Sequence, residues 1–159
     1  MLIAMVMLGC WLGLLLLARR QFFHIALLGF PGVVMHELAH LLVGMVLLAK
    51  PTSLNLWPRR VGNQWQFGSV GFTGLNLFNA APVAYAPLLL LGAAWFSFHH
   101  WMLPQVTHAD YAMALLWSYL IACATLYSLP SLTDIRVGGW STLFWTVLAS
   151  VSVWLYWGH

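Results

Sequence analysis

The sequence predicts an all-α polytopic membrane protein with about five transmembrane helices and a short interfacial β-hairpin after the second helix. Hydrophobic residues make up 62% of the chain and charged residues only 6%, whereas a soluble domain carries roughly 25% charged residues. The mean hydropathy is +0.86. Apolar runs near the length of about 20 residues that crosses a bilayer lie at residues 1–18, 22–48, 77–98, 111–129 and 140–157.

The first run, "MLIAMVMLGCWLGLLLLARR", has no basic n-region and no small-residue cleavage site before the arginine pair. It is therefore predicted to be a retained helix rather than a secretory signal. Cys10 and Cys123 fall inside apolar runs and lack metal-ligand spacing, so both are expected to be small apolar residues. The five runs leave little other sequence, which predicts a single transmembrane domain over residues 1–159.

The segment at residues 51–76 departs from the apolar runs. Within it, "SLNLW" and "QWQFGSV" alternate polar and apolar residues, and Pro58 and Gly62-Asn63 supply turn signals between them. The pattern predicts a β-hairpin, and Trp57 and Trp65 suit the headgroup level of a membrane. The hairpin could either serve a substrate or simply anchor the fold at the interface.

The basic residues predict the orientation. The formal net charge is +3, but six basic residues that flank apolar runs are better explained by membrane topology than by nucleic-acid binding. With five spans, one side carries four of them, namely Lys50, Arg59, Arg60 and Arg136, and the other side carries Arg19 and Arg20. The positive-inside rule then favours a bacterial inner (cytoplasmic) membrane with the N-terminus and the hairpin in the cytoplasm.

The segment "GFPGVVMHELAHLLVGMVLLAK" contains the pattern H-E-x-x-H at residues 36–40. On a helix, residues four apart lie on one face, so His36 and His40 can both bind one zinc ion. Glu37 can then activate water as a general base. A carboxylate at the centre of a membrane helix costs about 2.5 to 3.5 kcal/mol, which favours a functional role. The alternative is a structural glutamate paired with a polar group in the bundle.

A catalytic zinc needs a third protein ligand. His40 lies about eight residues, or about 12 Å, from the hairpin-side end of its helix, so the ligand should come from that half of the bilayer. Asp134 in "YSLPSLTDIRVGG" follows the fourth run on that side and is the predicted ligand; the alternative is a solvated aspartate paired with Arg136. The other candidates lie at the opposite membrane face or at the end of the chain, and they are Asp110, His24, His99, His100, His108 and His159.

Proline and glycine flank both halves of this predicted site. Pro130 frees backbone groups near a helix end, which bundles tolerate at a cavity, so the chain can bend Asp134 back toward the zinc. Gly29, Pro31 and Gly32 precede the H-E-x-x-H pattern. They either loosen that helix and admit water or form a packing kink.

Together these residues resemble the site-2 protease family of intramembrane zinc metalloproteases. The resemblance rests on H-E-x-x-H in a predicted transmembrane helix, the hairpin-like segment after it, a third span opening with "NAAPVAYAPLLLL", and the distal Pro130 and Asp134. It covers residues 22–139 as the family's core and predicts a minimal member without PDZ or CBS domains. The distal segment departs from the family's Asn, Pro and Asp-Gly pattern, because Ile135 follows the aspartate and Ser128 stands near the expected Asn.

The resemblance implies that His36, His40 and Asp134 bind Zn²⁺ and that Glu37 activates water. It also implies a zinc-dependent endopeptidase that hydrolyses a peptide bond in or near a transmembrane segment of a membrane-protein substrate, expected to be single-pass. The competing hypothesis is a non-proteolytic metal-binding or transport membrane protein, including a pseudoprotease. Only hydrolysis requires the glutamate beside the first histidine.

A substrate helix must unwind before it can be cut. An exposed strand edge in "QWQFGSVGFTG" could receive the extended segment by β-augmentation, with Asn76 and Asn79 as polar contacts. The expected partners are therefore this substrate and the lipid bilayer, with no nucleic acid. A regulatory membrane partner and a homo-oligomer both stay open.

Overall fold

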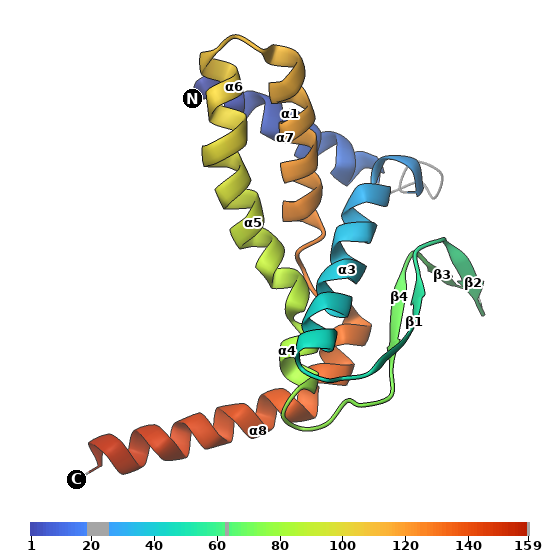
Figure 1. The fold of residues 1–159 in the computed structure, drawn as a ribbon, viewed down its shortest axis with the longest axis vertical. Coiled ribbons are helices and arrows are strands. Elements are labelled where there is room, and N and C mark those ends of the chain that lie inside the picture. Colours follow the sequence, from blue (N-terminus) through green and yellow to red (C-terminus); the bar gives the residue numbers. More distant parts are fainter. Residues whose placement is uncertain (19–25, 63, 159) are drawn as a thin grey trace.

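Figure 1 shows the computed structural model of the chain, which describes residues 1–18, 26–62 and 64–158. The α-helices are α1 (Leu2–Ala18), α3 (Phe30–Val46), α4 (Ala80–Ala84), α5 (Leu89–Ser97), α6 (Leu103–Thr107), α7 (Tyr111–Leu126) and α8 (Leu132–Trp157). A 3₁₀ turn, η1 (Ala86–Leu88), precedes α5, and a π-helical segment, η2 (Phe98–Met102), follows it. The strands are β1 (Pro51–Asn55), β2 (Arg59–Val61), β3 (Gln64–Gln66) and β4 (Ser69–Phe72).

The glycine and proline residues before the H-E-x-x-H pattern begin α3 rather than kink it. Gly29 is the N-cap, and Pro31 lies in the first turn, where a proline is tolerated because the N–H at that position has no helical partner. Gly32 serves packing, since the ring of Tyr127 occupies the space that a side chain would need. The close approach brings the end of α7 against α3 at the level of the histidines.

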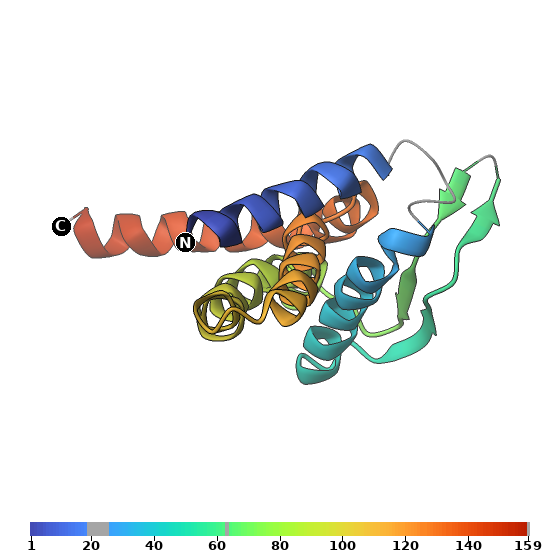
Figure 2. The ribbon, with the colours of Figure 1, turned by 90° about the horizontal axis from the view of Figure 1, so that it is seen from above.

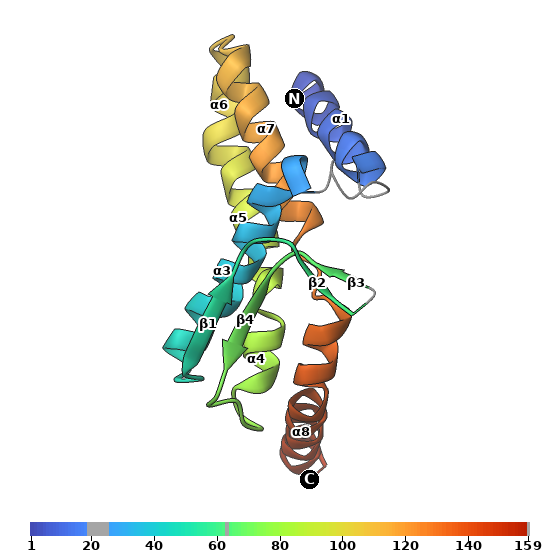
Figure 3. The same ribbon diagram turned by 90° about the vertical axis from the view of Figure 1, so that its right-hand side faces the viewer.

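The chain between α3 and α4 forms two short antiparallel ladders, β1 with β4 and β2 with β3. Gly62, in the turn between β2 and β3, has a φ of 61°, a left-handed conformation that glycine adopts readily. Strands and a glycine turn form in the predicted segment, but the single predicted hairpin is wrong, because "QWQFGSV" is divided between β3 and β4, which belong to different ladders. Pro58 instead lies between β1 and β2, where one ladder gives way to the next (Figure 3).

Helices α5 and α7 run side by side, and α1 packs against α7 (Figures 1 and 2). Alanine occupies the closest contacts: Ala4, Ala114 and Ala122 have no exposed surface. Small side chains at these positions let the helix axes approach closely. Asp110 begins α7 as its N-cap, and its side chain accepts a hydrogen bond from the Met113 N–H at 3.1 Å.

Among the described residues, helix α8 is anchored to the rest of the molecule through its first half and through Trp145, whose Nε1 donates to the Phe78 carbonyl at 3.1 Å. Ser141, buried in this contact, donates to the Leu77 carbonyl at 2.6 Å and accepts from the Ala81 N–H at 2.9 Å. Gly138 packs against Ala84 of α4. Beyond these contacts α8 runs away from the body, across the direction of α3, α5 and α7 (Figures 1 and 2).

The prediction of five transmembrane helices is wrong. Within the described residues, only α8 is long and apolar enough to cross a membrane. Helices α1, α3 and α7 have 17, 17 and 16 residues, short of the about 20 that a bilayer requires. The run at 77–98 is broken into α4, η1 and α5, because Pro87 has no N–H to continue the helical pattern. Apolar composition overestimated the lengths of the helices in the runs at 22–48 and 77–98.

Candidate metal centre

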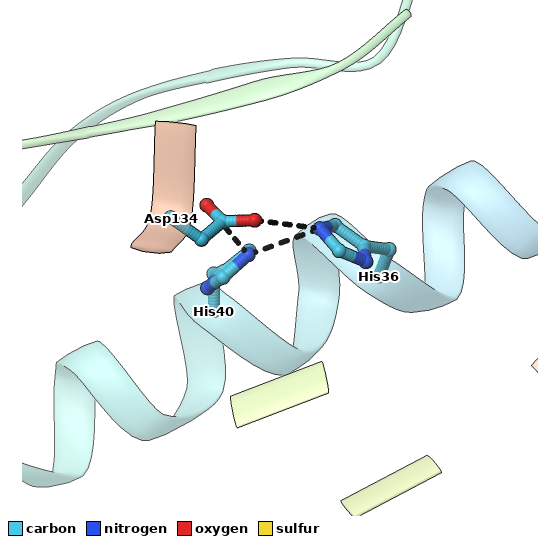
Figure 4. A group of neighbouring side chains, drawn as sticks. All are labelled: His36, His40 and Asp134. Carbon is cyan, nitrogen blue, oxygen red and sulfur yellow. Dashed lines mark hydrogen bonds and ion pairs between the residues drawn. The ribbon is translucent and has the colours of Figure 1, made fainter. Parts of the chain in front are cut away.

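Helix α3 places His36 and His40 one turn apart, on the face that looks toward the start of α8 (Figure 4). Their Nε2 atoms are 3.1 Å apart, and the two ring planes are inclined at 76°. The four-residue spacing brings both imidazoles to one side of the helix. The two histidines can therefore present nitrogen atoms to a single ion.

A backbone carbonyl holds each imidazole through its Nδ1 atom. His36 Nδ1 donates to the Tyr127 carbonyl at 2.8 Å, and His40 Nδ1 donates to the Val83 carbonyl at 2.7 Å. Because a carbonyl oxygen only accepts, each Nδ1 carries a proton, and a neutral ring then presents a lone pair at Nε2. Two lone pairs facing each other repel unless a cation lies between them. Metal-binding histidines are commonly oriented in this way.

Asp134 reaches the same point from the first turn of α8. Its Oδ2 lies 3.4 Å from His36 Nε2, and its Oδ1 lies 3.3 Å from His40 Nε2. A capping box holds the carboxylate in place, because the Ser131 N–H donates to Oδ2 at 2.6 Å and the Asp134 N–H donates to Ser131 Oγ at 3.2 Å. The structure thus brings together the three residues that the sequence singled out as ligands. The aspartate lies on a helix, not in the expected loop.

The two histidine–aspartate distances, unlike the 3.1 Å between the Nε2 atoms, match the ligand separations of a tetrahedral metal site better than those of an ion pair. A charge-assisted hydrogen bond between imidazolium and carboxylate measures about 2.7–2.9 Å, whereas the two contacts are 3.3 and 3.4 Å. A tetrahedral zinc with bonds of about 2.0–2.1 Å separates its ligand atoms by about 3.3–3.4 Å. Two imidazoles and one carboxylate also match the donors of catalytic zinc sites. His36, His40 and Asp134 could therefore hold a metal ion.

Glu37 lies beside this group in a different environment. Only 8% of its surface is exposed, yet no residue in the described part of the chain donates a hydrogen bond to its carboxylate. Its side chain lines the same cavity as the two histidines. Its oxygens are not among the buried polar atoms that lack a partner in the described residues, so the carboxylate is open to the cavity, where it can contact a water molecule.

The segment between β3 and β4 passes directly over Glu37. A Cβ atom at Gly68 would lie 2.5 Å from Glu37 Oε1, so the backbone can approach the carboxylate only because Gly68 has no side chain. This segment and the site residues line a cavity of about 660 Å³. Its remaining walls come from β4, α4, the α7–α8 connection and the start of α8, through Val70, Phe72, Val83, Leu129, Pro130 and Val137.

The other candidate ligands lie elsewhere. Asp110 caps α7. The Nδ1 atoms of His99 and His100 contact the Trp95 and Phe96 carbonyls of the preceding turn at 3.2 and 3.1 Å. Within the described residues, only His36, His40 and Asp134 form a group that could hold a metal. His24 and His159 lie outside the described residues.

The two asparagines predicted to contact a substrate have structural partners instead. Asn79 is buried, and its side-chain amide donates to the Leu47 carbonyl at 3.3 Å and the Gly74 carbonyl at 3.0 Å. Asn76 Oδ1 accepts from the Phe78 N–H at 2.9 Å. Asn79 therefore ties the end of α3 to the start of α4, and Asn76 shapes the turn before α4.

Sequence reasoning missed the groups that orient the ligands. The pattern Ser131-x-x-Asp134 before an apolar run is a capping-box signature, so the role of Ser131 could have been read from the sequence. The carbonyls of Tyr127 and Val83 lie 91 and 43 residues from their histidines. A backbone carbonyl leaves no residue-type signal, and only the fold reveals these contacts.

The chain was also compared with known proteins. No protein-family model, no curated protein and no solved structure matches it.

Proposed function

We propose that this chain is a zinc-dependent endopeptidase that hydrolyses a peptide bond in or near a transmembrane segment of a membrane-protein substrate, as the site-2 proteases that it resembles do. The observation that carries the proposal is the environment of Glu37. The Glu37 carboxylate directly follows His36, lines the same cavity as both histidines and accepts no hydrogen bond from the described residues, so it is suited to accept a proton from water. A metal-storage or transport site has no use for such a group.

In this proposal, three residues hold the metal ion and a fourth transfers a proton. Bound zinc would polarise the scissile carbonyl and lower the pKa of a water molecule toward about 7. His36, His40 and Asp134 would hold the metal ion, and all three line the cavity. Glu37 takes a proton from the attacking water and delivers it to the leaving amine.

The substrate enters as an extended segment along β4. One edge of β4 pairs with β1, and Ser69, Val70 and Phe72 line the cavity beside the metal group. Within the described residues, no strand pairs with the other edge of β4. An extended peptide could hydrogen-bond there by β-augmentation, which would place its backbone within reach of Glu37.

The membrane assignment rests on α8 and on the distribution of charge. Helix α8 is long and apolar enough to cross a bilayer, and all six Lys and Arg residues precede Val137, with Arg136 at the border. Arg19 and Arg20 are among the six and lie outside the described residues. By the positive-inside rule, the metal centre and the strands face the cytoplasm, as in a bacterial inner membrane.

The test replaces Glu37 with glutamine, which keeps the size of the side chain and removes the base. We expect purified Glu37→Gln protein to keep its zinc, measured by elemental analysis, and to lose cleavage by at least about 10²-fold. The same variant, carrying a photo-cross-linking side chain at Ser69, should trap substrates in native membranes. Mass spectrometry then identifies them.

Asp110→Asn is the matched control, because it is also an acid-to-amide change but at the N-cap of α7. It should leave both zinc and cleavage unchanged. Undiminished cleavage by Glu37→Gln would remove Glu37 from the chemistry. Zinc binding without any cleavage by the unaltered protein, against every trapped membrane protein, would favour the non-proteolytic alternative.

A further inference from the structure

We infer that the metal centre lies at the border between lipid hydrocarbon and water, so that it cuts substrates near one end of their transmembrane segments rather than at the centre. The placement of the centre follows from α8. The statement about substrates rests in addition on the proposed protease function.

Helix α8 is longer than the hydrocarbon layer and carries charged residues only at its start. It has 26 residues, or about 39 Å at 1.5 Å per residue, whereas the hydrocarbon core is about 30 Å thick and needs about 20 residues. Both charged residues of α8, Asp134 and Arg136, fall within its first five positions. The 20-residue apolar stretch therefore begins close to Val137 and reaches the end of the helix.

Every serine and threonine hydroxyl in that stretch donates to a backbone carbonyl of the protein. Thr142, Thr146, Ser150 and Ser152 each donate to the carbonyl four residues earlier, at 2.8 to 2.9 Å. Ser141 donates to the Leu77 carbonyl. A hydroxyl that faced water would not need such a partner, but one in hydrocarbon does, because lipid offers none. The same bond occurs at Thr107 and Thr125 in other helices, so this pattern is compatible with lipid contact along α8 and does not by itself require it.

The aromatic residues near the ends of α8 and the apolar residues between them also fit a helix surrounded by lipid. Trp140 stands near one end of the apolar stretch and Trp154 and Trp157 at the other, with exposed fractions of 77%, 68% and 79%, as expected for aromatic side chains at the two membrane interfaces. Between them, Val147 and Val151 are about half exposed. Acyl chains would cover these apolar faces and fill the apolar groove of about 940 Å³ between α4 and α8.

This placement sets the level of the metal centre. Asp134 lies three residues before Val137, or about 5 Å along the axis, on the aqueous side of the border. It lies within 3.4 Å of the nearest imidazole nitrogens, so His36 and His40 share its level. The strands, which carry Arg59 and Arg60, lie beyond the start of α8, on the side away from its direction of travel (Figures 1 and 2).

A border site selects a particular class of bond. The last carbonyls of a helix have no intrahelical partner, and at the membrane border water can satisfy the groups that unwinding exposes. In the hydrocarbon centre each exposed group would stay unsatisfied. The favoured substrates are therefore single-pass proteins whose transmembrane helix ends, or is easily unwound, at the cytoplasmic border.

The placement can be measured without a substrate. In the full-length Cys10→Ser, Cys123→Ala chain, single cysteines at Thr133, Val147 and Tyr156 carry a fluorophore in phosphatidylcholine vesicles. Lipids brominated near the middle of their acyl chains serve as quenchers. We expect the label at Val147 to be quenched at least about twofold more strongly than the labels at Thr133 and Tyr156. Equal quenching at Thr133 and Val147 would overturn the inference.

Zinc content of each labelled protein, measured by elemental analysis, shows that the site has stayed intact. A second arm uses a synthetic single-pass peptide with a 20-residue Leu/Ala span and Gly/Ser flanks, and mass spectrometry locates the cleaved bond. Cleavage near a border supports the inference, and cleavage in the middle of the span overturns it while the protease function stands. No cleavage of any peptide counts against the proposed function, and the quenching result still decides the placement.

Discussion

Replacing Asp134 with alanine should both release zinc and weaken the start of α8, because one carboxylate serves both purposes. Oδ2 accepts a hydrogen bond from the Ser131 N–H at 2.6 Å, and Oδ1 lies 3.3 Å from His40 Nε2. Asp110→Ala is a matched control. Asp110 also begins a helix, accepting from the Met113 N–H at 3.1 Å, but it takes no part in the histidine group.

The two contributions of Asp134 differ in size. Loss of a helix N-cap interaction costs about 0.5–2 kcal/mol, and both variants should show this loss. Zinc binding in small protein sites is worth about 10–16 kcal/mol, so one of three protein ligands accounts for roughly 3–5 kcal/mol. Asp134→Ala should therefore weaken zinc binding by about 10²- to 10⁴-fold. Asp110→Ala should leave zinc affinity unchanged.

The assay equilibrates each purified protein with a competing chelator over a series of free zinc concentrations. Bound zinc is measured by elemental analysis and stability by thermal unfolding in detergent. Ser131→Ala should fall between the two variants, with about a 10- to 100-fold loss of affinity, because the ligand remains but loses its support. If Asp134→Ala and Asp110→Ala retain equal zinc at every concentration, Asp134 is not a ligand.

Two further predictions concern the proton acceptor and the orientation. Gly68→Ala should reduce cleavage by at least about 10²-fold with zinc retained, because the added methyl would displace the Glu37 carboxylate. Gly139→Ala is the control, because no atom lies within 4 Å of a Cβ at that position. Full activity in Gly68→Ala would refute this placement of the base. In the Cys10→Ser chain in intact cells, a cysteine at Gly62 should be shielded from a membrane-impermeant thiol reagent and one at Gly158 should react; external labelling at position 62 would rule out a cytoplasmic site.

The sequence located the chemical groups better than it described the fold. His36 and His40 form a local pattern whose geometry depends only on a helix, and that helix is present. Asp134 was chosen from few candidates by its place on the hairpin side of a five-span topology; that topology is wrong, yet the structure places Asp134 beside both histidines. The orienting carbonyls of Tyr127 and Val83 depend on how α7 and α4 pack against α3, which no local pattern encodes.

The fold prediction failed because apolar composition does not show where helices break. The run at 77–98 looks continuous in hydropathy, yet it holds Asn79, which ties two elements together, and Pro87, which ends one helix. At the C-terminal end of the chain, the predicted helix was instead too short. The last span was placed at 140–157, but the Ser131–Asp134 capping box begins α8 eight residues earlier.

The two acidic residues near the histidines have roles that their surroundings separate. Asp134 Oδ2 accepts from the Ser131 N–H, and both of its oxygens face imidazole nitrogens, so this carboxylate is fixed beside the histidines, as the proposed ligand role requires. Glu37 directly follows His36 in the sequence. It has no hydrogen-bond donor in the described part of the chain, and it lines the cavity. Environments that differ in this way assign different tasks to two carboxylates in one site. The separation explains why a site with two acids needs only one of them as a ligand, and why exchanging their roles by mutation should not restore activity.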